Sequence, residues 1–491
     1  MAKKKKKSAI TMVSLLLTLV VLIGVYTWYS NRDTKKDTPE DKKTISLVKV
    51  DTTKVTAIHY VGMDYDMNFI LKDGIWKSKE EPDRPINQGN ISGMLVAISN
   101  IEANQVIADT LSDVANFGLD KPKPWIEVTM EDGSKVSLKL GMQAPTGDGY
   151  YALVNNLSKV YLLDSSFGSG LTYTKLSMTE IEKAPEITAT NINYLNIDKR
   201  EGEDIEVLLN ENGVEDNSGF GTYKWQYIKP YGDGYTADST EISQIQQSFA
   251  TFTYNGCVDY KGNDLAKYGL DKPTAAITVG YYVDSATPTK KPDVNSPTLG
   301  EAKVSKRYKI YIGNKADDDN YYVRVDGLKA VYLLGTSTVE SMIKVDAFTL
   351  VNKYAALVDI LRVDKITANV SGTNYVMDIK TTKTKDANDK EVINQTFKFN
   401  GKDTEEETFK TLYRLIDAII YEAPLKEKVD VSKLKQVFSI SFHLTDQDAP
   451  VSANVLSYND SFDIVDKGTG KYFLVDKRKI EMISDAVTNY K

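Results

Sequence analysis

The sequence predicts an α+β fold: an N-terminal transmembrane helix followed by three repeated modules, each an antiparallel sheet with helices on it. Three observations carry this prediction. An uncharged apolar run lies near the N-terminus, a short motif occurs twice as FGLDKP at 117–122 and YGLDKP at 268–273, and similar strand and helix patterns surround both copies. Runs of strands with one or two helices laid on a face are typical of α+β proteins.

The N-terminal segment predicts a single-pass membrane anchor. Residues 1–8, MAKKKKKS, form a basic cytoplasmic tail, and residues 9–29 carry no charge. A helix over this run would be about 31 Å long, enough to cross a bilayer core. The lysines keep the N-terminus inside, so the bulk of the chain is expected to be extracytoplasmic. A cleaved signal peptide is the alternative, although the apolar run is longer than is usual for one. Residues 30–46 read as a charged linker.

The modules are predicted from collinear patterns around the two motifs. Trp76 precedes the first copy and Trp225 the second, and each is followed by apolar residues at helical spacing. After each motif an alternating strand ends at glycine, VSLKLG in the first copy and YKIYIG in the second, and a Tyr-Tyr hairpin ends in VYLL. These patterns place repeat 1 at 47–185 and repeat 2 at 186–350.

A third, degenerate repeat is expected at 356–491. A strand pattern at 394–401, a helical stripe starting at Phe409 and a strand at 438–444 follow the same order, but the glycine motif is missing. Terminal repeats are often atypical because one side faces solvent.

The repeated motif, called the glycine turn below, reads as a helix stop. A glycine at the end of a short helix adopts the left-handed conformation without steric cost, the next leucine folds back, and the proline prevents the helix from resuming. The turn is therefore predicted to be structural, with the Asp-Lys pairs as the remaining weak candidates for binding a ligand. The predicted positions are Gly118, Leu119, Asp120 and Pro122, and Gly269, Leu270, Asp271 and Pro273.

Composition argues against several classes of function. The chain has one cysteine, Cys257, and two histidines, His59 and His443, which excludes an intrachain disulfide and most zinc and histidine-based sites. With 61 basic and 68 acidic residues and no basic stripe, nucleic acid is not expected as a partner. The triplet Asp317–Asp319 lacks the spacing of a calcium loop. We therefore expect a non-enzyme, with no catalytic, cofactor-binding or metal-binding residues.

The order of Trp strand, helix, glycine turn, LKLG or IYIG strand and VYLL hairpin resembles the bacterial family called domain of unknown function 4340. The resemblance implies a membrane-anchored accessory protein, since many members are encoded beside ABC-transporter components of the gliding-motility type. The family has no established catalytic residues to carry over.

These observations lead to an expected function and two alternatives. The expected function is a membrane-tethered extracytoplasmic scaffold at the cell membrane, with ABC-transporter subunits or a cell-wall polymer as partner. One alternative is a cell-surface enzyme that acts on glycans or peptidoglycan through paired carboxylates. The other is a carbohydrate-binding or adhesive module, because exposed members of the 30 tyrosines would suit such a surface.

Overall fold

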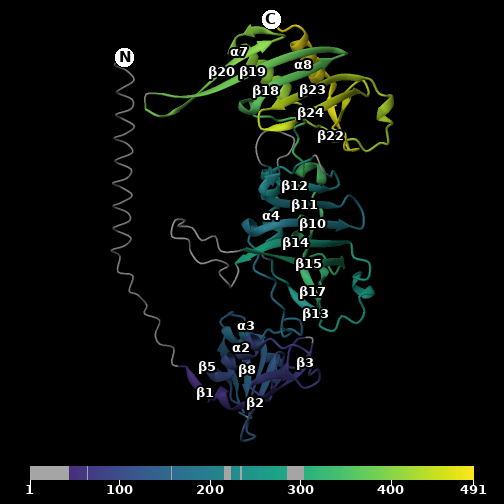
Figure 1. Cartoon of the computed structure of the whole chain (residues 1–491). Helices are drawn as coiled ribbons and strands as arrows, with labels where there is room; N and C mark the ends of the chain where they lie inside the picture. Colours follow the sequence, from purple (N-terminus) through teal and green to yellow (C-terminus); the bar gives the residue numbers. More distant parts are fainter. Residues whose placement is uncertain are drawn as a thin grey trace, which may run out of the picture. The chain divides into compact units, whose positions relative to one another are not determined.

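The computed structural model describes residues 44–63, 65–155, 157–214, 223–232, 235–250, 252–284, 303–386 and 388–491. These residues divide into two compact units, one ending at Glu180 and the other starting at Ile181. The first unit contains one antiparallel sheet, and the second unit contains two (Figure 1).

The first sheet has nine strands in the order β1-β5-β9-β8-β7-β6-β2-β3-β4. Two helices, α2 (Gln88–Ser99) and α3 (Ser166–Gly170), pack against each other, and α2 buries Ile91, Met94 and Ile98. The strands are β1 (Ile45–Lys49), β2 (Val55–Val61), β3 (Asp66–Lys72), β4 (Ile75–Ser78), β5 (Asn100–Ala108), β6 (Trp125–Met130), β7 (Lys135–Gln143), β8 (Gly149–Val154) and β9 (Val160–Asp164).

The second sheet has eight strands in the order β12-β11-β10-β14-β15-β16-β17-β13. Its helices are α4 (Ser239–Phe249), α5 (Thr336–Ile343) and α6 (Ala347–Leu350), and α4 packs against both of the others. The strands are β10 (Ile192–Lys199), β11 (Ile205–Val214), β12 (Tyr223–Lys229), β13 (Gly256–Asp259), β14 (Ala275–Asp284), β15 (Lys303–Lys315), β16 (Asn320–Val325) and β17 (Val331–Gly335).

The third sheet has nine strands in the order β21-β20-β19-β18-β23-β24-β25-β26-β22. Its two helices, α7 (Glu406–Asp417) and α8 (Lys477–Thr488), pack against each other. The strands are β18 (Val363–Val370), β19 (Thr373–Lys385), β20 (Glu391–Phe399), β21 (Lys402–Thr404), β22 (Ala423–Pro424), β23 (Gln436–Leu444), β24 (Gln447–Ser457), β25 (Phe462–Asp466) and β26 (Tyr472–Asp476).

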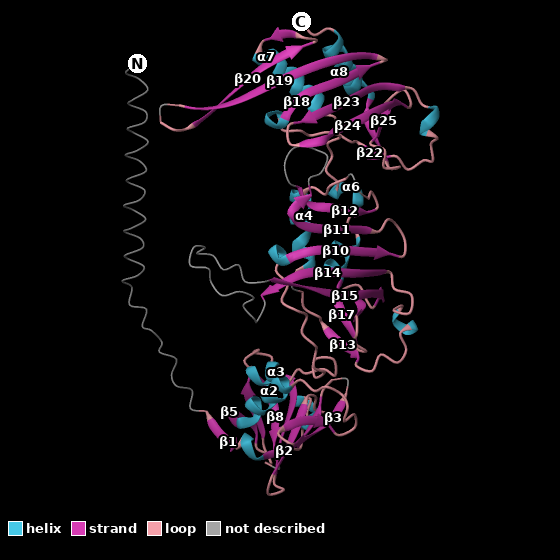
Figure 2. Ribbon diagram, viewed as in Figure 1, coloured by secondary structure: helices cyan, strands magenta, loops and turns pink. Residues whose placement is uncertain are grey.

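The three sheets share one connectivity. Each begins with a three-stranded meander, continues through a helix to a strand at the far side of the sheet, and returns to add a four-stranded meander beside its first strand. The first sheet adds β1 beyond that far strand, and the third adds β21 beside β20. Alternating side chains make one face of each sheet apolar, and the helices cover that face (Figure 2).

The structure corrects the predicted fold class. Strand makes up 45% and helix 20% of the described structure, which is therefore mainly antiparallel sheet and not the predicted α+β fold. Two or three short helices lie on one face of each sheet of eight or nine strands, so the helices that were predicted from apolar spacing make up only a small part of each module. Within the described ranges no helix is long and apolar enough to cross a membrane. The helix predicted at 9–29 and the tail at 1–8 lie outside those ranges, as does the linker up to residue 43.

Candidate functional site

Both glycine turns end a short 3-10 helix, Val114–Phe117 in the first sheet and Ala266–Tyr268 in the second. Gly118 and Gly269 follow with φ of +67°, the left-handed conformation that glycine adopts without strain. The leucines after them, Leu119 and Leu270, are 4% and 3% exposed. Asp120 and Asp271 are exposed, while Pro122 and Pro273 are half-buried and precede β6 and β14.

Each glycine turn docks on a glycine of the neighbouring strand. A Cβ on Gly141 would lie 2.2 Å from the Phe117 carbonyl oxygen, and a Cβ on Gly313 would lie 2.2 Å from that of Tyr268. An edge-to-face aromatic pair accompanies each contact, with ring centroids 4.9 Å apart: Phe117 with Tyr151, and Tyr268 with Tyr322. In the third sheet the corresponding 3-10 helix, Val431–Lys433, ends at Leu434 with a φ of −85°, so the left-handed stop is absent there.

The side chains considered for metal or acid–base chemistry are dispersed. His59 on β2 lies 2.7 Å from an Asp66 carboxylate oxygen, and its ring packs edge-on against Trp125 with centroids 4.5 Å apart. His443 lies on β23 of the third sheet, and Cys257 is buried on β13. Across the described ranges, no three histidine, cysteine or acidic side chains are grouped so as to hold a metal ion.

A backbone-paired strap, residues 351–358, joins the second sheet to the third. Val351 forms a bridge with Ala237 of the second sheet's module. The Ala355 amide donates to the Ile419 carbonyl oxygen over 2.8 Å, and the Tyr421 amide donates to the strap's Lys353 carbonyl over 2.8 Å. Because the strap pairs on both sides, the two sheets share one apolar core.

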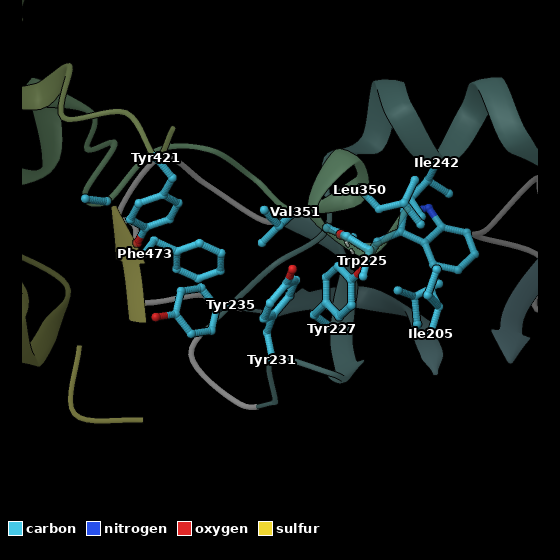
Figure 3. Close-up of a cluster of buried hydrophobic side chains, with 14 of the residues drawn as sticks. Ile205, Trp225, Tyr227, Tyr231, Tyr235, Ile242, Leu350, Val351, Tyr421 and Phe473 are labelled. Carbon is cyan, nitrogen blue, oxygen red and sulfur yellow. Dashed lines mark hydrogen bonds between the residues drawn. The ribbon is translucent and has the colours of Figure 1, made fainter. Parts of the chain in front are cut away.

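A row of aromatic rings crosses this junction (Figure 3). Tyr231 and Tyr235, in the loop after β12, both pack against Phe473 of β26, with centroids 5.0 and 5.1 Å away. Tyr421 stacks on the same ring at 4.4 Å. The Tyr235 hydroxyl also donates to the Lys471 carbonyl oxygen over 3.0 Å, so the contact combines ring packing with a hydrogen bond.

The far end of the strap is held by two side chains of α7. The Val358 amide donates to the Asp417 carboxylate over 2.8 Å, and the Tyr413 hydroxyl donates to the Val358 carbonyl oxygen over 2.7 Å. Burial raises the pKa of Asp417 to about 7, although the Val358 hydrogen bond acts in the opposite direction.

A cleft of about 1390 Å³ opens beside the aromatic row. Its wall includes the end of β10, the connection from α5 to α6, residues 423–429, and the turns on either side of β25. Five lysines and three acidic residues line it: Lys199, Lys344, Lys426, Lys428 and Lys471, with Glu203, Asp346 and Glu427.

One cleft residue has an unusual polar group. Tyr231 is 5% exposed, and its hydroxyl has no hydrogen-bond partner in the described part of the chain. The pKa of this hydroxyl is raised, first by burial and then by the charges of Glu203 and Asp346.

None of these cleft residues was predicted from the sequence to belong to a site. The available signals were weak: the tyrosines that frame YGDGY at 231–235 and the alternation KEK at 426–428. Both patterns are common in surface loops, and only the fold shows that these two segments line one cleft.

A family model described as domain of unknown function (DUF4340) matches residues 76–256 and 225–427. The chain belongs to the DUF4340 family. The predicted resemblance is thus confirmed, and the two DUF4340 matches begin at Trp76 and Trp225, the tryptophans of β4 and β12. Each match begins within one sheet and ends within the next. No curated protein and no solved structure matched the chain.

Proposed function

We propose that this DUF4340 protein is a non-enzymatic accessory scaffold whose second and third sheets bind a partner protein. The carrying observation is the strap, since its pairing on both sides joins the two modules whose loops line an open cleft. A cleft that is formed before binding reduces the conformational entropy that is lost when a partner binds.

The proposed location is the extracytoplasmic side of the cell membrane. The lysines of residues 1–8 and the uncharged run that follows them support attachment there with the basic end inside. The proposed partner is a subunit of an ABC-type envelope transporter, which is the setting that the family resemblance implies.

Two observations favour this scaffold over the alternatives. Among the described residues, the carboxyl groups whose pKa is raised by burial are Asp417 and Asp463. Neither lines the cleft, where a glycan-cleaving pair would be expected. Among the tyrosines whose burial is described, all are buried or half-buried except Tyr354, which is 38% exposed. Such packing does not suit an adhesive tyrosine surface.

Co-purification tests the scaffold. The full-length tagged chain, cross-linked in cells and recovered from detergent-solubilised membranes, is expected to bring down a transporter subunit. An unrelated protein with the same tag is the control. If recovery shows no transporter subunit enriched over that control, the transporter assignment is wrong. Protease added to intact cells is expected to digest the chain, and survival of the intact chain would contradict the proposed location.

A further inference from the structure

We propose that the cleft beside the strap binds an extended acidic peptide segment of the partner. The segment's carboxylates would face Lys426, Lys428 and Lys471. This inference rests on the proposed scaffold function and names the chemistry of the segment that it binds.

The basic rim supplies the first argument. Lys426 and Lys428 are exposed and flank Glu427, whose carboxylate accepts a hydrogen bond from the Tyr458 hydroxyl over 3.0 Å. That bond holds the Lys-Glu-Lys segment against the turn after β24. Within the described ranges no carboxylate lies at ion-pair distance from Lys426, Lys428 or Lys471. These three ammonium groups therefore remain available for an acidic partner.

The other two cleft lysines already have partners. The Lys199 ammonium donates to the Val345 carbonyl oxygen over 2.6 Å, and the Lys344 ammonium lies 2.7 Å from a Glu340 carboxylate oxygen. The positive charge that remains available is thus concentrated on residues 426–428 and 471. This concentration favours an elongated anionic ligand over a single small anion.

The size and floor of the cleft favour a peptide over an anionic glycan. At about 1390 Å³ the cleft is larger than a pocket for a small molecule, which typically measures about 300–1,000 Å³. Apolar side chains, including Phe348, Phe462 and Leu474, line it beside the lysines. An extended peptide points successive side chains in opposite directions, so alternating acidic and apolar residues would meet both surfaces.

The test is a titration of the full-length protein in detergent against a fluorescein-labelled ten-residue peptide of alternating glutamate and leucine. Fluorescence anisotropy is expected to report binding that weakens as salt is raised. The double variant Lys426→Gln/Lys428→Gln is expected to weaken binding by at least tenfold. The matched control, Lys390→Gln/Lys402→Gln, changes two exposed lysines of the same module and is expected to leave binding unchanged.

Three results would overturn the inference: no binding of the peptide, binding that the rim variant leaves intact, or selective binding of polygalacturonate in place of the peptide. The outcome separates from that of the scaffold proposal. If the rim variant co-purifies the partner as well as the wild type does, the cleft assignment alone is wrong. If the wild-type chain recovers no partner, the scaffold proposal is wrong.

Discussion

The docking of the glycine turn on β15 gives a quantitative prediction for Gly313→Ala. An added Cβ would lie 2.2 Å from the Tyr268 carbonyl oxygen and 3.1 Å from Leu270 Cγ. The first of these atoms is backbone, so relief requires the turn and the strand to separate.

Two routes lead to a similar cost. Overpacking a close-packed site costs about 1–3 kcal/mol. If the turn lifts away instead, Leu270, which is 3% exposed, loses burial worth about 1.5–3 kcal/mol. We therefore expect Gly313→Ala to destabilise the turn locally by about 3 kcal/mol. Gly327→Ala is the control: its φ is +80° with open space around the Cβ, so only the left-handed strain of about 1 kcal/mol applies.

Hydrogen exchange resolved by peptide is the suitable assay, because a chain with two compact units need not unfold in two states. The Thr274 amide, which donates to the Ile312 carbonyl oxygen over 2.7 Å, reports the docking of the turn. Its exchange is expected to accelerate about 100-fold in Gly313→Ala, the equivalent of about 3 kcal/mol. If Gly313→Ala perturbs the turn no more than Gly327→Ala does, the docking argument is refuted.

Three further predictions concern the junction of the second and third sheets. The pKa of Asp417 is raised from 3.8 to about 7, so between these values the folded state binds the proton more tightly and stability falls as pH rises from about 4 to 7. Asp417→Asn, which keeps an acceptor for the Val358 amide, is expected to flatten that dependence in melting curves from pH 4 to 8, and an unchanged pH slope would contradict it. Tyr227→Phe removes the hydroxyl that donates to the Ala347 carbonyl oxygen over 2.7 Å, and is expected to cost about 1–2 kcal/mol in thermal unfolding. Tyr421→Phe is expected to stabilise the protein by about 1 kcal/mol, since the buried hydroxyl that it removes has no described partner. A lowered melting temperature would show that a partner exists.

The glycine turns and the helix at Phe409 could be predicted from the sequence because they depend on a few neighbouring residues. The glycines at 118 and 269 adopt a conformation that other residues avoid, so a glycine after a short helix and before a proline identifies the turn. The same short patterns identified the DUF4340 family. The helical stripe at Phe409 was readable for the same reason, since α7 buries Phe409, Leu412 and Ile416 on one side.

The fold class was wrong because periodicity identifies elements one at a time. It does not show that β5, which follows β4 in the chain, pairs with β9 on the far side of the sheet. Nor does it show that one sheet of eight or nine strands carries only a few short helices. The helix predicted at 9–29 lies outside the described residues.

By itself, the sequence determined the glycine-stopped turns, the repeated order of elements and the family, since these depend on backbone preference and side-chain period within short segments. Only the tertiary structure decided that residues 351–358 pair with both the second and the third sheet's modules, and that Tyr231, Lys426 and Lys428 line one cleft. About 200 residues separate Tyr231 from those lysines along the chain. Their proximity arises from packing around a shared core, which no local pattern encodes.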